Sequence, residues 1–163
     1  MFLNKIKIFL LISICLIFFF LTYNDVKSDE IKIISGLAKV IDGDTIKIDN
    51  KKIRLIGIDA PEKKQNCKQI WLSISFISLQ KDYPCGEISA KRLKKKIHDK
   101  FIICKYTLKD RYKRYLAECF KDKININSWM VLTGNAVAYR RYSKKFVSQE
   151  NIAKKEKLGL WSG

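Results

Sequence analysis

The feature that most constrains the fold is a series of three short strand-like stretches separated by tight turns, at residues 37–41, 46–48 and 53–58. Asp42 and Gly43 end the first stretch, and Asp-Gly is a common hairpin turn. Ile46 and Ile48 alternate with charged residues, which indicates a half-buried strand. A chain that turns back this sharply places consecutive strands side by side in an antiparallel sheet.

The remainder of the chain predicts two more strands, at 101–108 and 112–120, and helices at 87–98, 127–132 and 146–158. Gly134 suits the left-handed position just after the second helix. Residues 63–86 are the least readable, because their apolar positions fit neither the helical nor the strand period. Five strands with helices after the third and the fifth predict an α+β, mainly β fold: a five-stranded OB-fold Greek-key barrel with about three helices.

Residues 1–28 do not fit this barrel. Lys5 and Lys7 precede an apolar run, which is typical of a signal peptide, and the run is short for a membrane-spanning helix of about 20 residues. The cleavage pattern before Asp29 is imperfect. Both a signal peptide and an N-terminal membrane anchor through residues 8–22 therefore remain open. We expect residues 29–163 to form one exported domain, periplasmic or secreted, or else anchored to the membrane.

The four cysteines outside the leader support export, because small exported domains commonly contain disulfides. Three pairings are possible. Cys67 and Cys85 flank one polar-bounded insertion, and Cys104 and Cys119 lie on strand-like stretches that could face each other across a hairpin. These positions favour Cys67–Cys85 and Cys104–Cys119. A zinc site is the weaker alternative, since the chain has no C-x-x-C and one histidine.

The charge of the chain points to a polyanionic partner. Its 163 residues include 33 Lys and Arg against 16 Asp and Glu, a formal net charge of +17. Such a surface attracts polyanions at long range. Charge alone would equally suit a solubility role, so the residues that carry chemistry must decide.

Carboxylates gather where the predicted second and third strands meet. Asp44 starts one strand and Asp59 ends the next, so antiparallel pairing would bring both to one end of the sheet. Two such carboxylates can share one Ca²⁺, with backbone carbonyls and waters as the other ligands. Glu62 follows a turn later and could reach a metal-bound water. Arg54 lies in the same apolar stretch as Asp59, where a charge is costly unless it is paired or faces a ligand.

Five motifs in this order resemble the staphylococcal-nuclease-like (thermonuclease) family over roughly residues 34–161. They are V-I-D-G-D-T at 40–45, R-L-I-G-I-D-A-P-E at 54–62, D-R-Y-K-R-Y-L-A at 110–117, V-A-Y at 137–139 and G-L-W at 159–161. The resemblance implies an OB-fold barrel that binds one Ca²⁺ and hydrolyses phosphodiester bonds.

The resemblance also assigns roles to particular residues. It implies that Asp44, Asp59 and the backbone carbonyl of Ala60 are calcium ligands. Arg54 and Arg114 would bind the phosphate, and Glu62 would be the general base for the attacking water. Tyr139 matches a tyrosine at the nucleotide site.

Three departures from the family pattern affect details. Lys113 stands where a glycine is usual, Arg141 replaces a second tyrosine near the site, and the 63–86 stretch is long. That stretch could be a lid, a substrate wall or a packing flap.

These observations predict an exported, monomeric, Ca²⁺-dependent nuclease that cleaves DNA and RNA with low sequence specificity and leaves 3′-phosphates. Two alternatives remain open. One is a non-catalytic nucleic-acid-binding OB-fold module of the cell envelope. The other is a disulfide-containing envelope protein whose basic surface binds anionic lipid or polymer.

Overall fold

The computed structural model describes residues 10–15 and 30–162. The chain divides into two compact units, Met1–Glu30 and Ile31–Gly163. In the first unit residues 10–15 and Glu30 are described, and residues 10–15 are helical. The predicted leader therefore lies largely outside the described residues. Among the residues that are described, no helix is long and apolar enough to cross a membrane.

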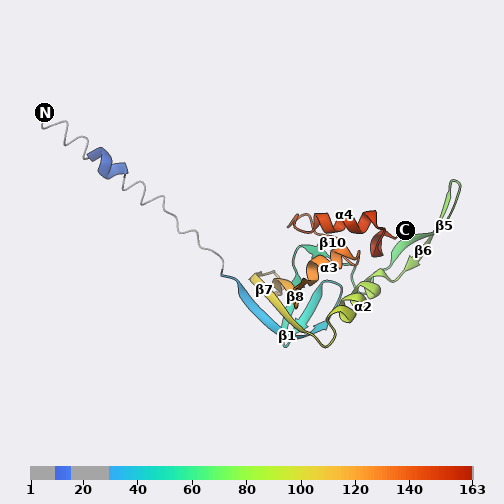
Figure 1. The fold of residues 1–163 in the computed structure, drawn as a ribbon, viewed down its shortest axis with the longest axis horizontal. Helices are drawn as coiled ribbons and strands as arrows, with labels where there is room; N and C mark the ends of the chain where they lie inside the picture. The colour runs from blue at the N-terminus through green and yellow to red at the C-terminus, as the bar shows by residue number, and fades with distance from the viewer. Residues whose placement is uncertain (1–9, 16–29, 163) are drawn as a thin grey trace. The chain divides into compact units, whose positions relative to one another are not determined.

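The second unit is built on a closed β-barrel (Figure 1). Its sheet has the order β3-β2-β1-β7-β8-β9, and β3 also pairs with β8 in parallel, which closes the barrel. The strands are β1 (Lys32–Val40), β2 (Thr45–Ile48), β3 (Lys51–Leu55), β7 (Phe101–Lys109), β8 (Tyr115–Lys121) and β9 (Ile124–Asn125). The prediction of a five-stranded OB-fold barrel is confirmed, with the short β9 as an addition at the edge of β8.

Alternating apolar residues fill the barrel. Ile46 and Ile48 from β2 and Ile53 and Leu55 from β3 are fully buried, which is the pattern that their period-two spacing predicts. Each such side chain contributes about 1.5–3 kcal/mol by burial. Helices α2 (Cys85–Ile97) and α3 (Ile126–Leu132) add further buried side chains to the barrel core. The described core residues all belong to the second unit, so we expect residues 30–163 to fold on their own.

The third predicted strand is not continuous, which corrects the sequence analysis. β3 ends at Leu55, and a separate strand β4 (Ile58–Asp59) pairs with β10 (Val137–Ala138). Between them Gly57 has a φ of +78°, a left-handed conformation that glycine adopts without steric cost. The chain therefore leaves the barrel at Gly57, and Asp59 lies on a different strand from Arg54.

The unreadable stretch forms a hairpin of β5 (Cys67–Ile74) and β6 (Ile77–Tyr83), which make their own two-stranded sheet. In Figure 1 this hairpin extends away from the barrel as a narrow arm. Its outer side chains are exposed, so the interpretation of this stretch as a packing flap is wrong.

Two disulfides and a C-terminal helix complete the unit. Cys67–Cys85 joins the start of β5 to the start of α2, and Cys104–Cys119 links directly opposed residues of β7 and β8; this is the favoured pairing. Helix α4 (Val147–Lys155) and the 3₁₀ turn η1 (Gly159–Trp161) follow β10. Gly134 has a φ of +68° just beyond α3, as its sequence position predicts.

Candidate active site

Asp44 lies at the entrance of β2 and is 2% exposed. One oxygen of its carboxylate accepts a hydrogen bond from the backbone N–H of Ala60 at 3.0 Å. The other accepts the Thr45 hydroxyl at 3.0 Å and contacts the Arg54 guanidinium. The buried carboxylate thus fixes the position of the loop that follows β4.

Arg54 joins the two aspartates. Its Nη1 pairs with Asp44, and its Nη2 donates to Asp59 Oδ1 at 2.5 Å. The side chain of Arg54 is 17% exposed and that of Asp59 is 49% exposed, so the cluster runs from the barrel interior to the surface. Both carboxylates therefore contact one guanidinium, although Asp44 precedes β2 and Asp59 lies on β4, after the Gly57 turn.

Burial and pairing shift the pKa values of this cluster in a consistent way. Burial raises the pKa of the Asp44 carboxyl to about 7, although Arg54 and the Ala60 N–H both act to lower it. Burial alone would lower the pKa of Arg54, but the Asp44 and Asp59 carboxylates raise it above its ordinary value. The guanidinium is therefore held charged where the two acids meet.

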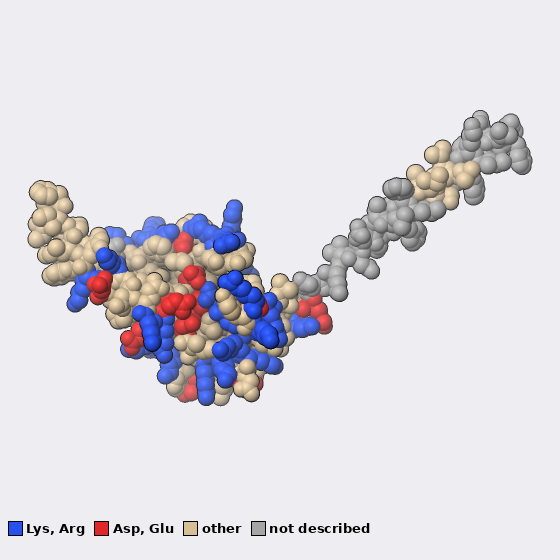
Figure 2. Space-filling model, turned by 180° about the vertical axis from the view of Figure 1, so that it is seen from behind, with Lys and Arg blue, Asp and Glu red and all other residues tan. Residues whose placement is uncertain are grey.

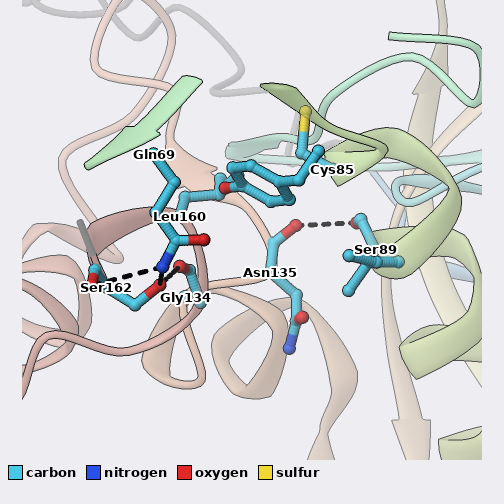
Figure 3. A pocket seen from close by; sticks show the side chains of 10 residues that line it. Gln69, Cys85, Ser89, Gly134, Asn135, Leu160 and Ser162 are labelled. Carbon is cyan, nitrogen blue, oxygen red and sulfur yellow. Dashed lines mark hydrogen bonds between the residues drawn. The ribbon is translucent and has the colours of Figure 1, made fainter. Parts of the chain in front are cut away.

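Gly43 lies where its own turn, helix α2 and the loop after β4 approach closely, and only glycine fits there. Its backbone carries no positive φ, but a Cβ there would lie 2.1 Å from the Ser89 hydroxyl and 2.6 Å from the Ala60 Cβ. Ser89 is on α2 and donates its hydroxyl to the Asn135 carbonyl at 2.7 Å (Figure 3). The interpretation of Asp-Gly as only a tight turn therefore missed its role: Gly43 lets α2 pack against the loop that holds Asp44.

The motif resemblance implies phosphodiester cleavage, and we expect Gly43→Ala to lower that activity by about 10²-fold, because displacement of reacting groups by about 1 Å can cost that much. Initial rates on single-stranded DNA would measure the loss. Adding Ser89→Ala removes the nearest clashing atom and should recover part of it. Full activity with an unchanged melting temperature in Gly43→Ala would show that this approach does not position the site.

Arg114 ends the β7–β8 turn, where Asp110 orients it. Asp110 accepts the Arg114 Nε–H at 2.8 Å and the backbone N–H groups of Tyr112 and Arg114, each at 2.9 Å. Burial opposes ionisation of Asp110, but these hydrogen bonds hold its pKa below the ordinary value. The turn extends to Lys113, so β8 begins at Tyr115 rather than at the predicted residue 112.

Lys113 adopts the left-handed conformation, with a φ of +62°. This explains why the family pattern has glycine there, since a side chain in that conformation costs roughly 1–2 kcal/mol. The hydrogen bonds to Asp110 on both sides of Lys113 hold the turn in spite of this cost. The substitution therefore leaves the turn formed.

Glu62 lies on an exposed loop that is tied to the start of α2. The backbone N–H of Glu62 donates to the Gln65 side chain at 3.1 Å, and the Glu62 carbonyl accepts the Gln65 N–H at 2.7 Å. The Glu62 carbonyl also lies so close to Gly86 that a Cβ there would meet it at 1.7 Å. Together with the Cys67–Cys85 disulfide, these contacts hold the loop against α2.

Tyr139 follows β10, and its backbone N–H donates to the Gly57 carbonyl at 3.0 Å. Its ring packs edge-on against Tyr142, with 4.9 Å between the centroids. Val137, two residues earlier, is the register partner of Asp59. Tyr139 is therefore held beside the turn that carries the exposed aspartate, and Tyr142 supplies the second aromatic ring near it.

Ion pairs and a hydrogen bond bring Asp44, Arg54, Asp59 and Ala60 together. Glu62, Arg114 and Tyr139 lie on three segments that flank this cluster, the loop after β4, the start of β8 and the end of β10. Sequence analysis missed the residues that support them: Gly43 as a contact point, Ser89, Asp110, Asn127 and Glu150. Of these, Asp110 carried a readable signal, since an acid four residues before Arg114 is positioned to pair with it in a tight turn.

Asn127 and Glu150 act from inside the fold. The buried Asn127 amide accepts the Cys119 N–H at 3.1 Å and donates to the carbonyls of Ile56 and Ala117, which ties α3 to β8 and to the end of β3. Glu150 on α4 accepts the Ala138 N–H at 3.1 Å and pairs with Arg140. Burial acts to raise the pKa of the Glu150 carboxyl, but these partners hold it below its ordinary value.

The structure is a closed OB-type barrel with a carboxylate–guanidinium cluster at the start of β2 and the end of β4. Comparison with known sequences identifies the family. The model of the family described as staphylococcal nuclease homologue matches residues 52–163. The chain belongs to this family, so the resemblance is confirmed. The matched range includes every predicted site residue except Asp44, which precedes it.

Three relatives illustrate the similarity. The chain is 35% identical to the succinoglycan biosynthesis protein ExoI of Rhizobium meliloti, over 78% of this chain and 64% of that protein. It is 36% identical to an uncharacterized endonuclease of Escherichia coli O157:H7, over 77% and 75% of the two chains. It is 34% identical to an uncharacterized endonuclease of Haemophilus influenzae, over 94% and 78%. The chain spans less than two thirds of the length of ExoI.

Proposed function

We propose that this chain is a nuclease: an exported, Ca²⁺-dependent, monomeric phosphodiesterase that cleaves DNA and RNA with low sequence specificity and leaves 3′-phosphates. The observation that carries the proposal is the Arg54 guanidinium held between the Asp44 and Asp59 carboxylates at the mouth of the barrel. Membership of the staphylococcal nuclease homologue family and the endonuclease names of two relatives support it.

The residues present fit a calcium ion. Asp44 and Asp59 supply hard carboxylate oxygens, which Ca²⁺ prefers, and both reach the same guanidinium. The described residues contain no cluster of three or more His, Cys, Asp or Glu side chains that could hold a metal. Backbone oxygen and water must therefore complete the ligand set, and the Ala60 carbonyl, whose own N–H is bound by Asp44, is the protein's third donor.

The side chains divide the chemistry among them. When bound, Ca²⁺ supplies positive charge that offsets the charge of the phosphate. Arg54 and Arg114 donate hydrogen bonds to the phosphate oxygens, and a guanidinium suits this because its donors form a planar fork. Glu62 accepts a proton from the attacking water as the new P–O bond forms. The bond between phosphorus and the 5′ oxygen breaks, the 5′ oxygen takes up a proton from solvent water, and the phosphate stays bonded to the 3′ oxygen.

Low sequence specificity follows from the same geometry. The proposed contacts go to phosphate, and contacts of this kind position a nucleic acid without reading its bases. Tyr139, packed against Tyr142, offers an aromatic face for a sugar or base, and stacking of this type tolerates any base. We therefore expect single strands to be cleaved in preference to duplexes.

Export is supported by two observations. The described residues hold two disulfides, which persist in oxidising compartments. The sequence of residues 1–28 has the charge and apolar pattern of a leader. We propose that residues 29–163 act outside the cytoplasm, either released after cleavage of the leader or anchored through residues 8–22.

The test is incubation of residues 30–163 with single-stranded DNA and RNA. We expect cleavage in Ca²⁺, its loss in EDTA, and its recovery when Ca²⁺ is restored, with 3′-phosphate ends on the products. Binding of both polymers without cleavage in Ca²⁺ would instead indicate the non-catalytic OB-fold module. Cleavage that persists in EDTA would contradict the metal dependence.

A further inference from the structure

The outer half of the β5–β6 hairpin combines exposed apolar side chains with an absence of charge. Residues 70–80 contain no charged side chain, in a protein of which 30% is charged. At the tip Phe76 is 94% exposed, and Trp71 is 63% exposed further down. In Figure 2 the outer part of the arm is tan, without the blue and red that mark charged residues on the body. Exposed apolar patches of this kind mark interaction sites.

Register shows that the hairpin has two unlike faces. Leu72 lies opposite Leu79, and Ile74 lies opposite Ile77, so these four exposed aliphatic side chains share one face. Ser73 lies opposite Ser78 on the other face, and their hydroxyls are 3.3 Å apart. We call the first of these, Leu72, Ile74, Ile77 and Leu79, the apolar face.

Lysines outnumber acidic residues at the root of the hairpin, where Asp82 lies opposite Lys68. Lys81 follows Leu79 on the apolar face towards the body, and Lys63, Lys64 and Lys68 lie near the disulfide that anchors β5. The root is also fixed to the C-terminal turn, because the Gln69 amide donates to the Ser162 hydroxyl at 3.0 Å (Figure 3). The root of the hairpin is therefore fixed to the body of the protein and rich in lysine, and the apolar tip extends beyond it.

We propose that this hairpin docks on an anionic lipid bilayer, with the apolar face and Phe76 in the interfacial layer and the basic root against the headgroups. Amphipathic elements bind membrane interfaces by apolar burial combined with attraction to anionic lipid. A hairpin that lies flat in this layer keeps the unpaired backbone N–H and C=O groups of its strand edges at the hydrated headgroups. This is necessary because unpaired backbone groups are not tolerated in the hydrocarbon core. Tryptophan favours the same layer.

A second copy of the chain is a less suitable partner for this surface. The apolar face centres on four side chains, whereas a stable protein interface involves about 20–30 residues on each side. Two copies that each carry a net charge of +17 also repel one another, while an anionic bilayer attracts them. Charge complementarity therefore favours lipid. The proposal does not depend on nuclease activity.

Sedimentation with vesicles tests this docking, using residues 30–163 so that the leader contributes nothing. We expect binding to phosphatidylcholine–phosphatidylglycerol vesicles and much weaker binding to phosphatidylcholine alone. Ile74→Ser/Ile77→Ser should weaken binding about tenfold or more, since the exposed apolar area of the two isoleucines together is enough for at least that effect. The matched control Ile70→Ser, which removes apolar area outside the apolar face, should stay within about twofold.

An unchanged circular dichroism spectrum, an unchanged melting temperature and the absence of free thiols would show that each variant is folded. Phe76→Ser, at the exposed tip, provides a second variant that removes no packing and should also weaken binding. Two results would overturn the proposal. One is equal binding of the apolar-face variant and the wild type, which would assign lipid binding to the basic body. The other is a wild-type protein that does not bind anionic vesicles. If that protein instead forms dimers that Ile74→Ser/Ile77→Ser abolishes, the partner of the apolar face is a second copy of the chain.

Discussion

Glu62→Gln should reduce cleavage of single-stranded DNA by roughly 10²–10⁴-fold, because a positioned general base contributes about that factor. Glutamine keeps the size and the hydrogen-bonding reach of the side chain but cannot take the proton. Hydrogen bonds between the Glu62 backbone and Gln65 hold the loop, so the substitution should leave the loop in place. Single-turnover rates in Ca²⁺, with binding measured separately, would quantify the effect.

Glu87→Gln is the matched control for this substitution. Glu87 lies in the first turn of α2, is exposed and pairs with Lys91. It changes net charge by the same amount near the same helix end, so cleavage should remain within about twofold of wild type. Binding of DNA by Glu62→Gln should also be retained. If Glu62→Gln cleaves at the wild-type rate, another group acts as the base and the assignment is wrong.

The barrel was largely predictable because its signals are local. Alternation at Ile46 and Ile48 and the tight turn at residues 42–43 place the end of β1 and both ends of β2 correctly to about one residue, although β1 begins earlier, at Lys32. The helices were equally readable from their apolar period and from Gly134. In each case the information lies within one element, so no knowledge of its neighbours was needed.

The errors occur where distant segments decide the local structure. The 53–58 stretch reads as one strand, but Gly57 breaks it because β10 pairs with residues 58–59 instead of a barrel strand. The hairpin at 67–83 could not be recognised from periodicity, because its apolar side chains do not face a core. Gly43 reads as a turn glycine, although Ser89 on a distant helix is what excludes a side chain there.

Residue types and the family resemblance pointed to the residues of the candidate site. They did not predict that Arg54 pairs with both Asp44 and Asp59. The antiparallel argument placed Asp44 and Asp59 at one end of the sheet, and the structure places them there by another route, through Arg54. An arginine in an apolar strand signals a partner or a ligand without saying which. Here it has both aspartates as partners, which has a consequence for metal binding.

Arg54→Met should weaken both stability and activity while strengthening the response to Ca²⁺. Methionine keeps the apolar stem but leaves the buried Asp44 carboxylate without its cation, and loss of one partner from a buried pair costs about 3 kcal/mol. Loss of a donor to the phosphate should lower cleavage by roughly 10²–10³-fold. Urea unfolding without Ca²⁺ and cleavage rates in Ca²⁺ would measure the two effects.

The response to Ca²⁺ distinguishes a metal site from a salt bridge that serves only stability. In the wild type the Arg54 guanidinium contacts both carboxylates, so Ca²⁺ must compete with it; in Arg54→Met it does not. The rise in melting temperature on adding Ca²⁺ should therefore be larger in Arg54→Met than in wild type, and absent in Asp44→Asn. Arg92→Met, on the exposed face of α2, should change unfolding by less than about 0.5 kcal/mol. If Ca²⁺ stabilises neither the wild type nor Arg54→Met, the two aspartates exist to hold Arg54 and the calcium assignment fails.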